Sequence, residues 1–288
     1  MIRIDDPGDE RIMPFRVRDR ALNTRADRRE SVAAGLFVAE GDLVVGRALD
    51  ARCTPVMAFV DADDPPPVVH RLGPGVALYC ADEAVRRDAM GFGVALSVVA
   101  LFRRPAPRTA APMICFPRVI ALEAIDNPVN IGTVVRSAAA LGWDGLLLDR
   151  TCADPLARRA LRVSMGNSFA LPFARAASLL DVVAEARNRG SLVVALTPAS
   201  DAVALDALRP AADQRVLLLL GSERRGLSEE LMAAATVRAT IPMESGVDSL
   251  NVAAAAAIAC YQLRAAAAGA GIATASESAS GIDQGQRR

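Results

Sequence analysis

The stretch Ile125–Ala138 reads Ile-Asp-Asn-Pro-Val-Asn-Ile-Gly-Thr-Val-Val-Arg-Ser-Ala and follows an apolar run that ends at Leu122. The apolar run predicts a buried strand, and the residues after Asn130 have the spacing of a helix with one buried face. Asn130 stands where a helix N-cap is expected, and Arg136 lies off the apolar face with a side chain long enough to lean back towards the turn. An amide and a guanidinium beside a strand end suit a phosphate or a ribose. Taken alone, the stretch fits a simple cap and a solvated arginine equally well.

Strand and helix patterns alternate on both sides of this stretch. Apolar strands alternating with helices predict an α/β fold whose parallel sheet is covered on both faces, with ligands bound at the carboxyl ends of the strands. The expected strands are 119–125, 145–149, 192–197, 216–221 and 237–242, and the expected helices are 130–141, 154–165, 176–189 and 228–235. A further helix, expected from Ser249 to about Ala268, is apolar nearly all round and should be buried in the core or against a second subunit.

Composition shifts divide the rest of the chain. We expect a charged N-terminal extension over residues 1–30, a smaller α/β domain over 31–104, a proline-rich linker over 105–117, the larger α/β domain over 118–268 and a disordered tail over 269–288. The linker prolines are expected to continue neither helix nor strand, and the Gly- and Ser-rich tail lacks the apolar residues of a packed core.

Composition also excludes several classes of protein. The formal net charge is zero, so a protein that coats nucleic acid through bulk positive charge is not expected, although a local arginine patch is compatible with it. Five scattered cysteines and a single histidine predict neither a metal site nor a disulfide framework, which favours a reducing cytosol. We expect no signal peptide and no membrane span, and therefore a cytoplasmic protein.

Two later stretches resemble the first in placing polar residues at the end of an apolar strand. In Leu217-Leu-Leu-Leu-Gly-Ser-Glu-Arg-Arg-Gly-Leu-Ser228, a strand ends at Gly221, where the backbone can approach a ligand closely, and Glu223 follows. In Ile241-Pro-Met-Glu-Ser-Gly-Val-Asp-Ser-Leu-Asn-Val252, a helix is expected to begin with Ser249 and Asn251 in its first turn. These side chains are expected to gather near Asn130 and Arg136.

In this order and spacing, the three stretches closely resemble the SpoU (TrmH-like) family of RNA 2′-O-ribose methyltransferases, within the SPOUT superfamily. The resemblance covers residues 119–263 and implies a deep trefoil knot, S-adenosylmethionine bound in a bent form, and an active site completed across a homodimer. Carried over to matching positions, it implies a catalytic group of Asn130, Arg136, Glu223, Ser249 and Asn251, and cofactor contacts from Gly221, Ile241, Leu250 and, less directly, Thr197. In such enzymes the arginine is usually proposed as the base. Because a guanidinium stays protonated, we expect Arg136 to be required and leave the base unassigned.

The first α/β unit carries a second resemblance. Leu36-Phe-Val-Ala-Glu-Gly41 is similar to the start of the ribosomal-protein-like substrate-binding domain found in many relatives that act on ribosomal RNA. An RNA partner is therefore expected, with ribosomal RNA favoured over transfer RNA. The chain departs from related proteins at Val94-Ala95-Leu96, where a His-Arg-Gly element often stands, and this bears on which RNA it recognises.

Two other functions remain open at this level. A knotted fold could grip RNA without catalysis, although the five polar motif residues argue against that. A dinucleotide-dependent enzyme is disfavoured because no Gly-x-Gly-x-x-Gly follows an expected strand. Cofactor binding discriminates between them. A dehydrogenase prefers a nicotinamide dinucleotide, whereas a pure RNA binder binds neither that dinucleotide nor S-adenosylmethionine.

Overall fold

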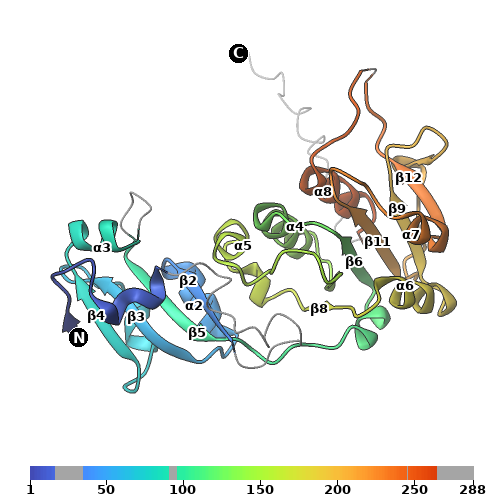
Figure 1. Cartoon of the computed structure of the whole chain (residues 1–288). Coiled ribbons are helices and arrows are strands. Elements are labelled where there is room, and N and C mark those ends of the chain that lie inside the picture. Colours follow the sequence, from blue (N-terminus) through green and yellow to red (C-terminus); the bar gives the residue numbers. More distant parts are fainter. Residues whose placement is uncertain (17–34, 91–95, 245, 265–288) are drawn as a thin grey trace, which may run out of the picture.

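A computed structural model describes residues 1–16, 35–90, 96–244 and 246–264, which form two units, each built around one sheet (Figure 1). The first unit comprises β1 (Ile2–Arg3), η1 (Glu10–Phe15), β2 (Leu36–Glu40), α2 (Asp42–Asp50), β3 (Pro55–Asp61), η2 (Pro67–Arg71), β4 (Ala77–Ala81), α3 (Glu83–Met90) and β5 (Val98–Arg103). The second comprises η3 (Ala111–Cys115), β6 (Arg118–Glu123), α4 (Pro128–Ala140), β7 (Gly145–Leu148), α5 (Arg158–Val163), η4 (Asn167–Phe169), β8 (Phe173–Arg175), α6 (Leu179–Asn188), β9 (Leu192–Leu196), β10 (Val203–Ala204), η5 (Leu205–Ala207), β11 (Val216–Gly221), α7 (Glu229–Ala234), β12 (Val237–Thr240) and α8 (Val252–Gln262).

The second unit has the predicted α/β architecture. Its seven strands are all parallel, in the order β10-β12-β9-β11-β6-β7-β8. Alternate residues of each central strand face opposite sides: Ile120 and Leu218 join the core that includes α4 and α8, whereas Val119 and Leu217 join the core that includes α6. Burial on both faces explains why these strands read as unbroken apolar runs. The trefoil knot implied by the resemblance stays a prediction.

The helix of the first motif begins earlier than expected. Pro128 occupies its first turn, where a missing N–H costs nothing, and the side chain of Asn127 accepts a hydrogen bond from the Val129 N–H at 2.9 Å. The assignment of Asn130 as the N-cap was therefore wrong. Asn130 lies inside the first turn of α4, where its side chain is available for other contacts. The close approach of α4 to α5 depends on Gly132, because a Cβ there would lie 2.6 Å from the Ala160 carbonyl oxygen.

The last helix also differs from its expectation. Within the described residues it spans Val252–Gln262, so Ser249 precedes it, and the expected segment beyond Arg264 and the expected tail lie outside the described residues. Its apolar composition does not bury it all round, because Ile258 and Tyr261 are 43% and 58% exposed. The apolar composition of α8 therefore predicted more burial than the described residues provide.

The first unit contains a mixed sheet in the order β1-β4-β3-β5-β2. Residues 1–16 belong to it: β1 pairs with β4, and Ile4, Ile12 and Phe15 are buried against one face of the sheet. The expectation of an N-terminal extension separate from the first α/β domain is therefore wrong for residues 1–16, in which only a few apolar residues mark the contact with the sheet. The rest of that extension, residues 17–30, lies outside the described part.

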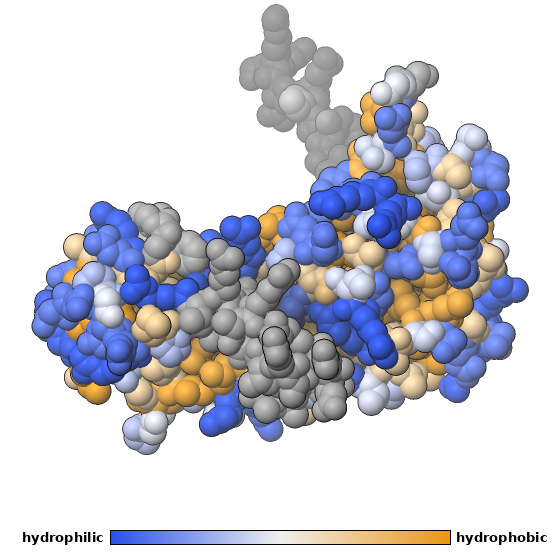
Figure 2. Space-filling model, in the orientation of Figure 1, coloured by the Kyte–Doolittle hydropathy of each residue, from blue (hydrophilic) through white to orange (hydrophobic). Residues whose placement is uncertain are grey.

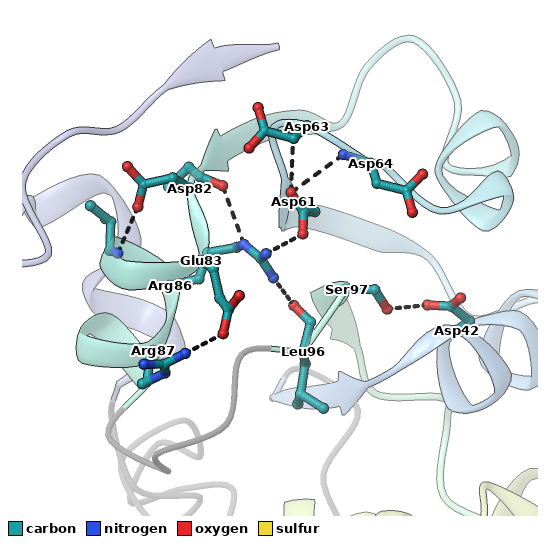
Figure 3. Close-up of polar contacts among 12 residues, drawn as sticks. Asp42, Asp61, Asp63, Asp64, Asp82, Glu83, Arg86, Arg87, Leu96 and Ser97 are labelled. Atoms are coloured by element: carbon teal, nitrogen blue, oxygen red, sulfur yellow. Dashed lines mark hydrogen bonds and ion pairs between the residues drawn. The ribbon is translucent and has the colours of Figure 1, made fainter.

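The buried guanidinium of Arg86 ties three segments of this first unit together (Figure 3). It is 3% exposed, donates to the carbonyl oxygens of Ala81 at 3.2 Å and of Leu96, and forms an ion pair with Asp61. These partners satisfy a charge that would otherwise be costly to bury. Leu96 is the last residue of the segment that departs from related proteins. Its neighbours Val94 and Ala95 lie outside the described residues.

The two units pack against each other through α5 and β2. Glu40 is 6% exposed; its Oε1 lies 3.2 Å from Arg158 Nε and its Oε2 forms an ion pair with Arg162. Beside this pair, the rings of Phe37 and Phe169 lie 5.5 Å apart, within an apolar cluster that both units share. The shared apolar cluster and the two ion pairs of Glu40 thus join the first unit to the second.

The segment between the units is not an irregular tether. It contains η3, whose first turn accommodates Pro112 and whose Met113 and Ile114 are buried against the sheet of the second unit. The expectation that this segment forms no helix was wrong for these residues. On the face drawn in Figure 2, hydrophilic and hydrophobic residues are interspersed over both units.

Candidate active site

Three side chains from the three motifs meet in one hydrogen-bonded cluster. Asn130 Nδ2 donates to Glu223 Oε1 at 2.5 Å, and Asn251 Nδ2 donates to the same oxygen at 3.1 Å. Asn251 Nδ2 also lies 3.2 Å from Asn130 Oδ1, which closes a triangle. The parallel sheet explains this meeting: β11 pairs with β6, and Gly221 stands opposite Glu123 at their carboxyl ends. The expected convergence of these three residues is therefore present in the fold.

The cluster is anchored to two helix starts. Asn130 is 6% exposed in the first turn of α4. Asn251 is the N-cap of α8, and its Oδ1 accepts hydrogen bonds from the Ala253 and Ala254 amides at 3.0 and 3.4 Å. The Asn251 amide oxygen thus caps the helix, while the amide nitrogen donates to Glu223 and Asn130. One side-chain amide therefore links the start of α8 to the side chains of Asn130 and Glu223.

Arg136 and Ser249 do not join this cluster. Arg136 lies on α4 beyond Asn130 with an exposed side chain, and within the described part of the chain it forms no hydrogen bond or ion pair. Ser249 is exposed just before α8. Arg136 is consequently free to bind a ligand or a second chain.

A cavity of about 450 Å³ lies at the carboxyl ends of β9, β11 and β12 and beside the start of α8. This is the edge of a parallel sheet at which ligands are expected, and the volume suits a small organic molecule. All four positions expected to contact a cofactor line it, together with two of the expected catalytic residues: Thr197, Gly221, Ile241, Leu250, Glu223 and Ser249. Asn130, Arg136 and Asn251 are not among its lining residues.

The loop at the edge of this cavity leaves no room for a side chain at Gly221. A Cβ there would lie 2.1 Å from the carbonyl carbon of Gly226 and 2.3 Å from the backbone nitrogen of Leu227. The loop closes on itself because the Gly226 N–H donates to the Ser222 carbonyl oxygen at 2.8 Å, with Gly226 at φ +68°. Only glycine at position 221 permits this fold of the loop.

Two residues at the site were missed in the sequence. Glu123, at the end of β6, accepts a hydrogen bond from the Ser228 amide at 2.7 Å and so holds the far end of the same loop. Arg225 lines the cavity. A charged residue at the mouth of a strand was the signal that singled out Glu223, and the same signal was present at Glu123.

The described residues provide neither a metal-ion site nor a membrane-spanning helix. None of their His, Cys, Asp and Glu side chains gather in threes in a way that could hold a metal ion. Among the helices that the structure describes, none has the length and apolar character needed to cross a bilayer.

Residues 117–261 match the model of the SpoU rRNA Methylase family. The chain is 37% identical over 262 residues to an uncharacterised tRNA/rRNA methyltransferase of Mycobacterium bovis, a match that covers 89% of each chain. It is 25% identical to the 23S rRNA (guanosine(2553)-2′-O)-methyltransferase RlmP of Bacillus subtilis, over 82% of this chain and 92% of that one.

A solved structure is also similar across both units. The AdoMet-bound rRNA methyltransferase from Sinorhizobium meliloti superposes with a TM-score of 0.74 at 27% identity, covering 90% of this chain and 96% of that one. The similarity therefore extends to the first unit, which lies outside the family match.

Proposed function

Since this chain belongs to the SpoU rRNA Methylase family, we propose that it is an S-adenosylmethionine-dependent RNA methyltransferase that methylates a ribose 2′-hydroxyl, with ribosomal RNA as its substrate. The observation that carries the proposal is the cluster of Asn130, Glu223 and Asn251 at the edge of the sheet where Gly221 and Leu250 line a cavity. The 2′-hydroxyl and the ribosomal substrate are supported by the similarity to RlmP and by a first unit packed firmly on the second.

The residues of the cavity fit the proposed cofactor. Leu196, Leu220, Ile241 and Leu250 supply apolar surface, and Thr197 and Ser249 supply hydroxyl groups, in a volume within the usual range for small-molecule sites. S-adenosylmethionine, when bound, supplies an activated methyl group on a sulfonium. Thr197, Gly221, Ile241 and Leu250 would hold it.

The polar cluster would then position the ribose. Asn130 and Asn251 are fixed by Glu223 and by the start of α8, so their amide groups reorganise little when substrate arrives. Orientation of this kind supplies much of the rate in a displacement between two bound molecules. Arg136 is exposed, and we assign it the role of binding an RNA phosphate, to which a guanidinium binds in a bidentate manner.

We further propose that the active form is a homodimer. Ile258 and Tyr261, which lie on one face of α8, leave apolar surface exposed, and Val129 on the neighbouring α4 is 39% exposed. Exposed apolar side chains on two packed helices mark a surface that another chain can cover. The helix whose composition indicated burial would thus be buried by a second copy.

Tyr261→Asp is expected to convert the dimer into monomers, because it places a charge in the apolar interface. Light scattering coupled to size-exclusion chromatography measures the change. Leu180→Asp, at a 37% exposed position on α6, is the matched control and should leave the oligomeric state unchanged. A wild-type protein that is monomeric at micromolar concentration would exclude the dimer.

Methyl transfer tests the proposed function. Labelled S-adenosylmethionine is incubated with the protein and total RNA from a strain that lacks this gene, and the labelled RNA species is identified. We expect label in one ribosomal RNA. Label in transfer RNA would overturn the substrate, and failure to bind the cofactor at all would favour an RNA-binding protein without catalysis.

A further inference from the structure

The turn that joins β6 to α4 has a backbone conformation that its own sequence does not favour. Ala124 has φ +54°, in the left-handed region that residues with a Cβ rarely adopt. This residue separates the last residue of β6, Glu123, from the turn that leads into Asn130. A neighbouring segment must therefore hold the turn in place.

Asp149, the residue after β7, supplies that hold. Its Oδ2 accepts hydrogen bonds from the Ala124 amide at 3.1 Å and from Thr151 Oγ1 at 2.8 Å. Its Oδ1 accepts from the Thr151 and Cys152 amides at 2.9 and 2.8 Å. Burial raises the pKa of Asp149, but the hydrogen bonds from Thr151, Cys152 and Ala124 outweigh it and keep this pKa below its ordinary value. A carboxylate with four donors is a rigid support.

The same segment also holds the next residue of the turn. Cys152 Sγ accepts from the Ile125 amide at 3.4 Å and donates to the Leu122 carbonyl oxygen at 3.3 Å, while the Ala153 amide donates to the Ile125 carbonyl oxygen at 2.8 Å. Burial raises the pKa of Cys152 to about 12, so the sulfur remains a thiol able to donate. Residues 149–153 therefore hydrogen-bond to the backbone of both Ala124 and Ile125.

We propose that Asp149 is a positioning residue for methyl transfer: it fixes the β6–α4 turn so that Asn130 meets Glu223 and Asn251. The proposal rests on the proposed function, because it assigns Asp149 to the cluster on which that function depends. Asp149 makes no hydrogen bond to these three residues. It acts directly on the backbone of Ala124, and on Ile125 through Cys152, from whose amide it accepts a hydrogen bond.

The chain provides a matched control at the other end of the same pair of strands. Asp144 precedes β7, and its Oδ2 accepts a hydrogen bond from the Arg118 amide at 2.9 Å, where β6 begins. Each aspartate thus bonds to the backbone at one end of β6. Only Asp149 does so at the end that carries the cavity and the polar cluster.

The test compares Asp149→Ala, Asp144→Ala and the double variant Asp149→Ala/Ala124→Gly. For Asp149→Ala we expect kcat for RNA methylation to fall about 10- to 100-fold, as for a misplaced catalytic group, with the Kd of S-adenosylmethionine within about twofold of wild type. Asp144→Ala should lower Tm and keep kcat. Because glycine adopts positive φ readily, Ala124→Gly should restore most of the lost kcat.

Three kinetic results would overturn the proposal: an unchanged kcat in Asp149→Ala, an equal loss of kcat in Asp144→Ala, or no recovery in the double variant. Hydrogen exchange provides a readout that does not depend on activity. Exchange across residues 124–131 should quicken in Asp149→Ala and stay unchanged in Asp144→Ala. If the wild type transfers no methyl group, the proposed function fails, and unchanged exchange in Asp149→Ala would reject the positioning role separately.

Discussion

Arg136→Ala is expected to reduce kcat for methyl transfer by about 10²- to 10³-fold, the loss typical when one charge-stabilising group is removed from an active site. The protein should remain folded, with its free energy of unfolding within about 0.5 kcal/mol of wild type. The reason is structural: Arg136 is exposed and makes no hydrogen bond or ion pair with any described residue. The effect of Arg136 on activity must then come from a contact with a bound molecule or with a second chain.

Steady-state kinetics and thermal unfolding together check this result. Arg159→Ala is the control, since Arg159 is an exposed arginine on α5 of the same unit. Arg136→Lys keeps the charge and loses the planar fork, so it should recover only part of the activity if a phosphate is bound in a bidentate manner. Arg159→Ala losing as much activity as Arg136→Ala would contradict a specific role for Arg136.

Gly221→Ala should abolish binding of S-adenosylmethionine. The new methyl group would lie 2.1 Å from a backbone carbon of Gly226, so the loop that lines the cavity has to open. The atoms that the methyl group would meet, in Gly226 and Leu227, belong to the backbone and cannot move aside as the end of a flexible side chain could. Overpacking against fixed atoms typically costs about 1–3 kcal/mol, and here the displaced atoms form the cavity wall.

Calorimetric titration of the cofactor measures this effect. Gly142→Ala is a suitable control because Gly142 has φ +74° and a Cβ added there would meet no atom within 4 Å, so alanine introduces strain without a collision. The Gly142→Ala protein should have a lower Tm than wild type, because of the strain at positive φ, and should still bind the cofactor. Unchanged cofactor affinity in Gly221→Ala would mean that the cavity is not the binding site.

Much of the site follows from the sequence because a parallel sheet brings strand ends together. Asn130, Glu223 and Asn251 each follow an apolar strand, so the alternation of strands and helices is enough to predict their meeting. The position of Arg136 could not be predicted in this way. Where a long side chain ends on an exposed helix face depends on the ligand or chain that contacts it.

The errors have identifiable physical causes. The Asn127-Pro128 pair marks the start of α4, because proline is favoured in the first helical turn. The prediction of Asn130 as the N-cap did not take this signal into account. The strands β8 and β10, with three and two residues, are too short to show a period. Burial of Ile4, Ile12 and Phe15 depends on contacts with β3, β4 and β5 far along the chain, which local patterns do not record.

The central claim is that the methyl group goes to a ribose oxygen of RNA, and the chemical position of the label tests it most directly. RNA methylated with labelled S-adenosylmethionine is hydrolysed in alkali, which cleaves through a free 2′-hydroxyl and leaves a bond next to a 2′-O-methyl ribose intact. We predict label in an alkali-resistant dinucleotide from one site of ribosomal RNA, and at least about 100-fold slower labelling with Arg136→Ala. Label on a base, released as a mononucleotide, would contradict the account.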